Sequence, residues 1–163
     1  IQNAAVSDSA DWCARLARLR LHPMHPLIAY EWLFGLTEIL HIIGFAIAIG
    51  SIGIVDLQLA GWGFRDTTAA ALQRELDPWT NAGLALVSVS GLLILSTDGA
   101  RYLTHPAMLA KLVLFALAIM FHYSWHAAAA RGTFAATAAR AFAATSVLLW
   151  TAVVFGGIFY AFT

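Results

Sequence analysis

The chain of 163 residues is 61% hydrophobic and only 11% charged, with nine basic and nine acidic side chains and a mean hydropathy of +0.77. Soluble domains carry about 25% charged residues, so this composition indicates an integral membrane protein, and the length suits one domain. The even charge balance argues against a nucleic-acid partner. The single cysteine, Cys13, excludes a disulfide framework and thiolate metal sites.

The first 26 residues are predicted to form a short polar segment at the membrane interface. Residues 11–20 have the pattern of an amphipathic surface helix, and a frayed terminus explains them equally well. The run His22-Pro-Met-His25-Pro predicts a bend, because two prolines so close together exclude a regular helix interior. The first twenty residues lack the basic-then-apolar order of a cleavable signal peptide.

Residues 27–163 are predicted to form one transmembrane domain. A helix needs about 20 apolar residues to cross a bilayer. Asp77-Pro78 has the pattern of a helix start, and Asp98-Gly99 has that of a helix stop. We therefore expect an all-α, integral membrane, up-down four-helix bundle. Its helices should span about 27–59, 78–96, 106–130 and 141–162.

The first span contains ionisable residues inside its apolar run. Placing such a group in the bilayer core costs about 2.5–3.5 kcal/mol, so a partner or a function is expected for it. His41 lies ten residues after Glu31, and His122 lies eleven after Lys111 in the third span, which runs the same way. At 1.5 Å per residue both are about 15–17 Å deep. Two imidazoles at one level predict axial ligation of haem b, with His126 as the alternative partner of His41.

Other residues of these spans are given roles around that site. Gly44 would let another helix, or the flat porphyrin, come close, and Glu38 would hydrogen-bond an imidazole. Lys111 is expected to reach the lipid headgroups, and Asp56 to pair with Arg65, Arg74 or loop amides at the far interface. The alternative is that each membrane histidine only bridges two helices, which contributes about 0.6–2 kcal/mol.

A second group of histidines is predicted on the N-terminal side of the membrane. His22 and His25 precede the first span, and His105 lies in the loop that returns to that side. Three imidazoles would suit copper or zinc, or a second haem. Interfacial histidines beside prolines are the simpler explanation.

The first span also carries the motif of a known family. The pattern Trp32-Leu33, Glu38, His41-Ile-Ile-Gly44, Gly50, Asp56-Leu-Gln-Leu and Gly61 resembles a bacterial family of four-helix membrane proteins of unknown function. Pro106 to Lys111, with Met108 where phenylalanine is usual, and then His122 extend the resemblance over about residues 27–160. Gln58 departs from it, because arginine is commoner there. That family is distantly similar to copper-resistance D-type proteins and to four-helix b-type cytochromes, which implies metal or haem handling.

The resemblance implies a bacterial inner membrane. Five basic residues on the N-terminal side against four on the opposite side predict that both termini are cytoplasmic. No phosphate-binding loop, nucleophile elbow or His-Glu-x-x-His motif is present, so no catalytic residue is predicted. We expect a haem b-binding electron carrier in contact with a membrane redox partner or complex, at most the electron-transfer subunit of an oxidoreductase. The alternatives are a cofactor-free accessory subunit and a copper-handling protein.

Overall fold

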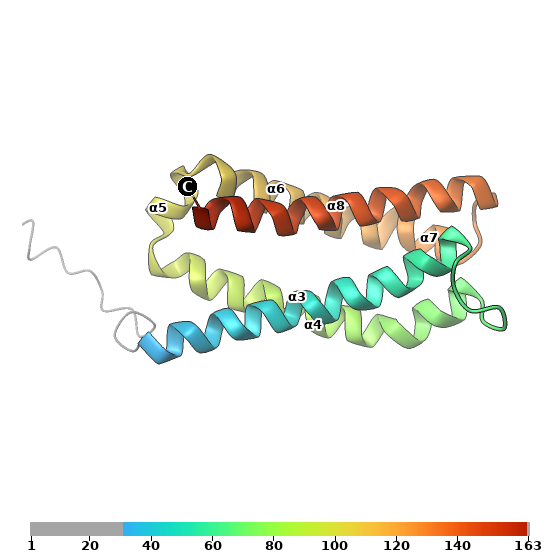
Figure 1. The fold of residues 1–163 in the computed structure, drawn as a ribbon, viewed down its shortest axis with the longest axis horizontal. Coiled ribbons are helices and arrows are strands. Elements are labelled where there is room, and N and C mark those ends of the chain that lie inside the picture. Colours follow the sequence, from blue (N-terminus) through green and yellow to red (C-terminus); the bar gives the residue numbers. More distant parts are fainter. Residues whose placement is uncertain (1–30, 163) are drawn as a thin grey trace, which may run out of the picture. The chain divides into compact units, whose positions relative to one another are not determined.

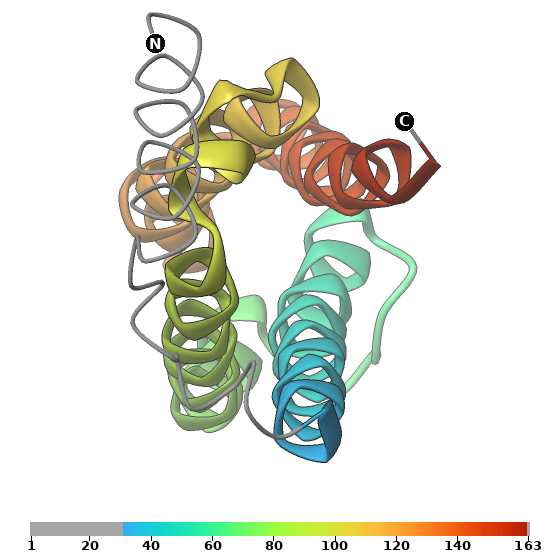
Figure 2. The same ribbon diagram turned by 90° about the vertical axis from the view of Figure 1, so that its left-hand side faces the viewer.

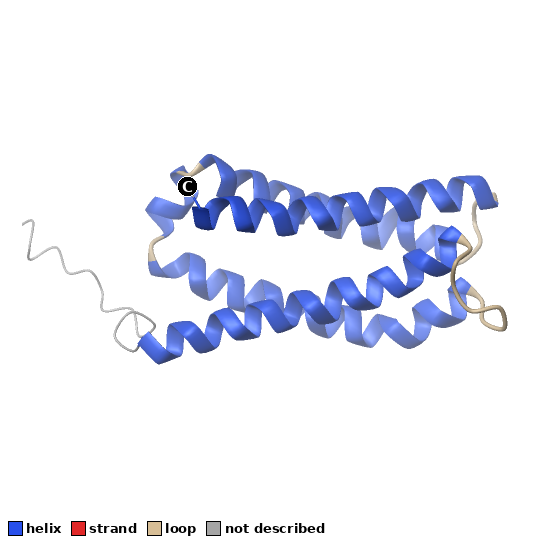
Figure 3. Cartoon of the chain, viewed as in Figure 1, coloured by secondary structure: helices blue, strands red, loops and turns tan. Residues whose placement is uncertain are grey.

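A computed structural model of the chain describes residues 31–162 and divides the chain into two compact units, 1–35 and 36–163. The interfacial segment expected over 1–26 lies outside the described residues. The second unit contains long apolar helices that alternate in direction, and the described residues contain no strand (Figure 1, Figure 3).

The described residues form four helical spans. The first is α3 (Glu31–Ala60) and the second is α4 (Ala69–Thr97). A short helix, α5 (Gly99–Thr104), leads to the third span, which consists of α6 (Pro106–Phe121), the π-helical turn η1 (His122–His126) and α7 (Ala127–Ala130). The fourth is α8 (Ala136–Phe162). All four are long and apolar enough to cross a membrane, which confirms the predicted all-α membrane bundle.

Two helices end at glycines whose backbone is left-handed. Gly61, with φ of 88°, follows α3, and Gly132, with φ of 79°, follows α7. After α3, the Trp62 N–H donates to the Leu57 carbonyl at 3.0 Å and the Gly61 N–H donates to the Gln58 carbonyl at 3.1 Å. This is the Schellman arrangement, which satisfies carbonyls that have no partner within the helix.

The second span begins nine residues earlier than predicted. Its N-cap is Thr68, whose Oγ1 accepts a bond from the Ala71 N–H at 3.2 Å. Asp77-Pro78 therefore lies inside α4, so that predicted start is wrong; the exposed Pro78 leaves the Arg74 carbonyl without its i+4 donor. Gly99 begins α5 rather than stopping α4 with a left-handed turn, because the Asp98 side chain caps α5.

Close approaches between backbones hold the bundle together. A Cβ at Gly44 would lie 2.8 Å from the Val87 nitrogen, and one at Gly83 would lie 2.6 Å from the Ala48 nitrogen. Only glycine allows α3 and α4 to cross at this distance. Seen along the helix axes, α3 and α4 form one side of the bundle, and α6 and α8 pack together on the other (Figure 2).

The interior of the bundle is small and its outer surface is apolar. The buried cluster comprises Ala48, Ile52, Leu84, Val87, Ala118, Trp150 and Val153. Many large hydrophobic side chains face outward instead, among them Val89, Val113, Leu148 and Phe155. In water such a surface would be unfavourable, so the unit is a multi-pass membrane protein whose outer surface contacts lipid.

Candidate functional site

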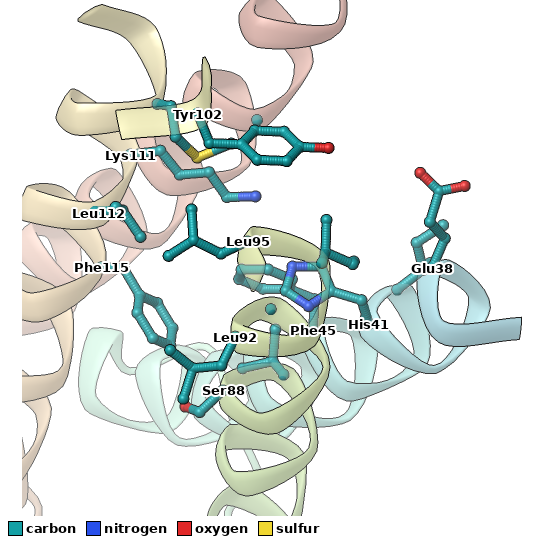
Figure 4. A pocket seen from close by; sticks show the side chains of 16 residues that line it. Glu38, His41, Phe45, Ser88, Leu92, Leu95, Tyr102, Lys111, Leu112 and Phe115 are labelled. Atoms are coloured by element: carbon teal, nitrogen blue, oxygen red, sulfur yellow. The ribbon is translucent and has the colours of Figure 1, made fainter. Parts of the chain in front are cut away.

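A cavity of about 550 Å³ lies between the helices at one end of the bundle (Figure 4). The first half of α3, the last turns of α4, the short α5, the start of α6 and the end of α8 all contribute to its wall. Most of the lining is aliphatic or aromatic, and the polar side chains are few: Glu38, His41, Ser88, Tyr102 and Lys111. This size and composition are typical of a pocket for a small molecule or cofactor.

His41 lines this pocket with one of its ring nitrogens fixed. Its Nδ1 lies 2.9 Å from the Ser90 Oγ. The Ser90 hydroxyl donates its single hydrogen to the Leu86 carbonyl at 2.6 Å, so its oxygen accepts from His41. Nδ1 therefore carries the proton and Nε2 has a free lone pair. An imidazole held by its second nitrogen in this way is ready to ligate a metal or to accept a hydrogen bond.

Lys111 supplies a positive charge to the same pocket. Its side chain extends from α6 toward His41 (Figure 4), and its Nζ lies 5.7 Å from the centre of the Phe45 ring. That contact is a cation–π interaction. Within residues 31–162 no carboxylate forms an ion pair with this ammonium group. The expectation that Lys111 reaches the lipid headgroups is therefore wrong, because the side chain is half-buried against the pocket.

Aromatic rings form a continuous contact from His41 to the core. Phe45 packs edge-on against His41 at 5.1 Å, and Phe115 packs against Phe45 at 6.1 Å. Trp150 packs next against Phe115, with ring centres 6.1 Å apart. On the other side of the imidazole, a Cβ at Gly91 would lie 3.0 Å from Cε1 of His41. His41 is thus clamped between α4 and an aromatic wall.

Two other residues predicted around His41 have different roles. Glu38 lies at the edge of the pocket, and its carboxylate points away from the imidazole (Figure 4). Gly44 is buried against α4, where Val87 and Gly83 occupy the space expected for a porphyrin. The small residue allows contact between two helices, which is one of its two predicted roles, and the room expected for a porphyrin is taken by α4.

His41 and His122 do not line the same pocket. His122 is 4% exposed and packs on His126, with ring centres 5.1 Å apart, and on Tyr123 at 5.0 Å. Neither His122 nor His126 contributes to the pocket wall. The expected pair of axial ligands, with His126 as alternative, is therefore not assembled in this structure.

The histidines of the third span belong to a second polar cluster, near the other end of α3. His126 Nε2 lies 2.8 Å from Oδ1 of Asp56, and the Ser146 hydroxyl donates to Oδ2 at 2.9 Å. All three side chains are buried. The predicted pairing of this carboxylate with Arg65, Arg74 or loop amides is wrong, because His126 and Ser146 come from the neighbouring helices and satisfy it inside the bundle.

One of the three histidines of the predicted N-terminal metal site lies among the described residues. His22 and His25 lie outside the described residues, and His105 stands at the N-cap of α6, with its backbone N–H bonded to the Tyr102 carbonyl at 3.3 Å. Across residues 31–162 no group of three or more His, Cys, Asp and Glu side chains is arranged to hold a metal ion.

No family model, curated protein or solved structure matches this chain. Function must therefore be argued from the two polar sites themselves. The pocket offers a free imidazole nitrogen and an ammonium group within apolar walls. Such a site suits a mainly apolar molecule that carries a metal, a carbonyl or an anionic group.

Proposed function

We propose that the protein binds haem b in the pocket beside His41 and carries electrons within the membrane. The observation that carries this proposal is the hydrogen bond from Nδ1 of His41 to Ser90, which leaves Nε2 free at the wall of a pocket of about 550 Å³. Haem iron accepts a single imidazole ligand in several protein classes. His41 is the one residue of the sequence-based pair that lines the pocket.

The rest of the lining fits the same group. Haem has a broad apolar ring, which Phe45, Phe115 and Leu92 would contact, and two propionates, one of which Lys111 would bind. Met108 also lines the pocket, and its thioether is the residue type that supplies a second axial ligand in some cytochromes. The bound group supplies the one-electron chemistry, while the chain holds it and sets its surroundings.

The proposal extends to the cellular setting. The chain lies in the bacterial inner membrane with both termini in the cytoplasm, and a redox partner or complex exchanges electrons with it. Residues 61–68 and 131–135, which connect long helices, are too short to form a catalytic domain. We assign substrate chemistry to that partner.

The experiment is a comparison of visible spectra. The wild type and the variants His41→Ala and His122→Ala are purified in mild detergent from cells supplied with haem precursor, and oxidised and dithionite-reduced spectra are recorded. We expect about one b-type haem per chain in the wild type and in His122→Ala, and none in His41→Ala. Loss in both variants would instead support the two-histidine site inferred from sequence. A colourless wild type would refute haem binding.

A quinone is the second candidate ligand, because the pocket contains both a hydrogen-bond acceptor and a hydrogen-bond donor. His41 Nε2 can accept from a quinol hydroxyl, and the Lys111 ammonium can donate to a quinone carbonyl. If the purified wild type is colourless, extraction with organic solvent followed by chromatography for quinone tests this candidate. His41→Ala and Lys111→Met should each reduce the amount recovered. If the wild type holds neither molecule, the cofactor-free accessory role and the copper-handling role remain as hypotheses.

A further inference from the structure

The cluster around Asp56 has no role in the pocket just described. Fifteen residues of α3 separate Asp56 from His41, which is about 22 Å along a helix. The cluster contains a serine, a histidine and an aspartate, but they are not connected as in a serine hydrolase, where the serine hydroxyl bonds to the imidazole. Here Ser146 and His126 each bind the carboxylate of Asp56, and the hydroxyl is not bonded to the imidazole. Ser146 is thus a donor that holds Asp56 and not an activated nucleophile.

These contacts fix the state of His126. An ionised carboxylate only accepts hydrogen bonds, so the proton on His126 that faces Asp56 lies on Nε2. The lone pair is then on Nδ1. This atom is buried and has no hydrogen-bond partner among the described residues, and His126 as a whole is 0% exposed.

His122, one turn earlier, has a second buried nitrogen without a hydrogen-bond partner in the described part of the chain. Its Nδ1 is also buried without a partner among residues 31–162, and the side chain is 4% exposed. The two rings are stacked at 28°, with centres 5.1 Å apart. A buried polar atom without a partner costs about 1–3 kcal/mol. Two adjacent ones indicate that a group absent from the chain pairs with them.

We propose that His122 and His126 bind a late first-row transition metal ion of the zinc or copper class through their Nδ1 atoms. Imidazole nitrogens suit these metals, whereas magnesium and calcium prefer oxygen ligands. Zinc–nitrogen bonds are about 2.0–2.1 Å long, so one ion bound to both atoms requires the rings, with centres 5.1 Å apart, to turn from their stacked arrangement until the two lone pairs converge. The ion would also compensate the negative charge of Asp56.

Asp56 acts behind the ligand rather than on the metal. A carboxylate that accepts from the second nitrogen of a ligating histidine fixes its tautomer and orientation and raises its basicity. Ser146 holds the other carboxylate oxygen in place. The π-helical turn from His122 to His126 supports a functional site, because such turns are rare and occur frequently at functional sites. Because both nitrogens are buried, the remaining positions would be taken by water that enters with the ion.

The test is metal titration of the whole purified chain. The protein is stripped with a chelator and titrated with Zn²⁺ by calorimetry, with Co²⁺ absorption as a second readout. We expect one ion per cluster, bound at least tenfold more weakly in His122→Gln and in His126→Gln. Ser124→Ala is the matched control, because its exposed hydroxyl lies in the same turn and bonds only to the Met120 carbonyl. This control should bind as the wild type does.

A second variant set separates this cluster from the N-terminal histidines. Replacing His22, His25 and His105 together by glutamine should leave the cluster's binding intact. Asp56→Asn should weaken binding by about 10–100-fold without changing the ligands. Absence of saturable binding in the wild type, or binding that survives both single substitutions, would overturn the proposal.

X-ray absorption on the zinc-loaded wild type keeps the test decisive if the histidine variants do not fold. Two imidazole nitrogens at about 2.0–2.1 Å are expected in the first coordination shell. A shell without imidazole would overturn the proposal.

Discussion

Replacing Ser146 by alanine removes one of the two hydrogen bonds that hold the buried Asp56 carboxylate. The bond is 2.9 Å long, and both residues are at most 4% exposed, so water cannot replace the lost donor. Hydrogen bonds to charged groups contribute about 1.5–3 kcal/mol in proteins, whereas those between membrane helices average about 0.6 and reach about 1.7. We therefore expect Ser146→Ala to lower the free energy of unfolding by about 1.5–2 kcal/mol.

The assay is reversible unfolding in mixed micelles by added dodecyl sulfate, with chelator present so that bound metal does not contribute. Thr145→Ala is the control, because Thr145 is exposed and its hydroxyl bonds only to the Ala141 carbonyl one turn back. It should change stability by less than about 0.5 kcal/mol. In a double-mutant cycle with Asp56→Asn, the two changes should be strongly non-additive. Equal small losses in Ser146→Ala and Thr145→Ala would refute the buried network.

Three further predictions concern packing, a loop and the pocket. Gly83→Leu should prevent the crossing of α3 and α4, because even a Cβ would lie 2.6 Å from the Ala48 nitrogen. Gly50→Leu should be tolerated, because nothing else among the described residues lies within 4 Å of a Cβ there, and the measurement is the yield of monodisperse protein for each variant. Gln58→Leu should make residues 61–68 more sensitive to limited proteolysis, because its amide bonds Phe64 and Thr67. Lys111→Met should lower retention of the proposed haem during detergent exchange at least tenfold, because the propionate would lose its positively charged partner in the pocket.

The spans could be predicted because membrane crossing depends on length and hydropathy, both of which are local properties. Helix ends are harder to predict. Asp77-Pro78 has the chemistry of a start, yet Thr68 caps α4 nine residues earlier. A proline inside a membrane helix is tolerated where other groups or solvent satisfy the freed carbonyl. The sequence alone does not say which of two capping residues is used.

The predicted pairing of His41 with His122 depends on where depth is counted from. The prediction takes Lys111 as the point where the third span enters the membrane. That span begins five residues earlier, at Pro106, and Lys111 lines the same pocket as His41. Counting back from the glycines that end α3 and α7 gives another result. His41 lies twenty residues before Gly61, and His122 only ten before Gly132, which corresponds to about 15 Å of separation.

The same count from the helix ends identifies the cluster that sequence reasoning missed. Asp56 lies five residues before Gly61, and His126 lies six before Gly132, so the two are level. A difference of one residue corresponds to about 1.5 Å along a helix. Ser146 had no comparable signal, because a serine in an apolar helix usually bonds to its own backbone. Its partner is visible only once α8 packs beside α3.

Small residues in α3 and α4 determine how closely these two helices cross. Gly44 and Gly83 bring α3 and α4 into backbone contact, and Ser90 then lies within reach of His41 two turns further along α4. Gly91 leaves the space that the imidazole occupies. The crossing of two helices thus determines which nitrogen of His41 faces the pocket. Substitutions at the crossing should therefore change the chemistry of the pocket even though they contact no ligand.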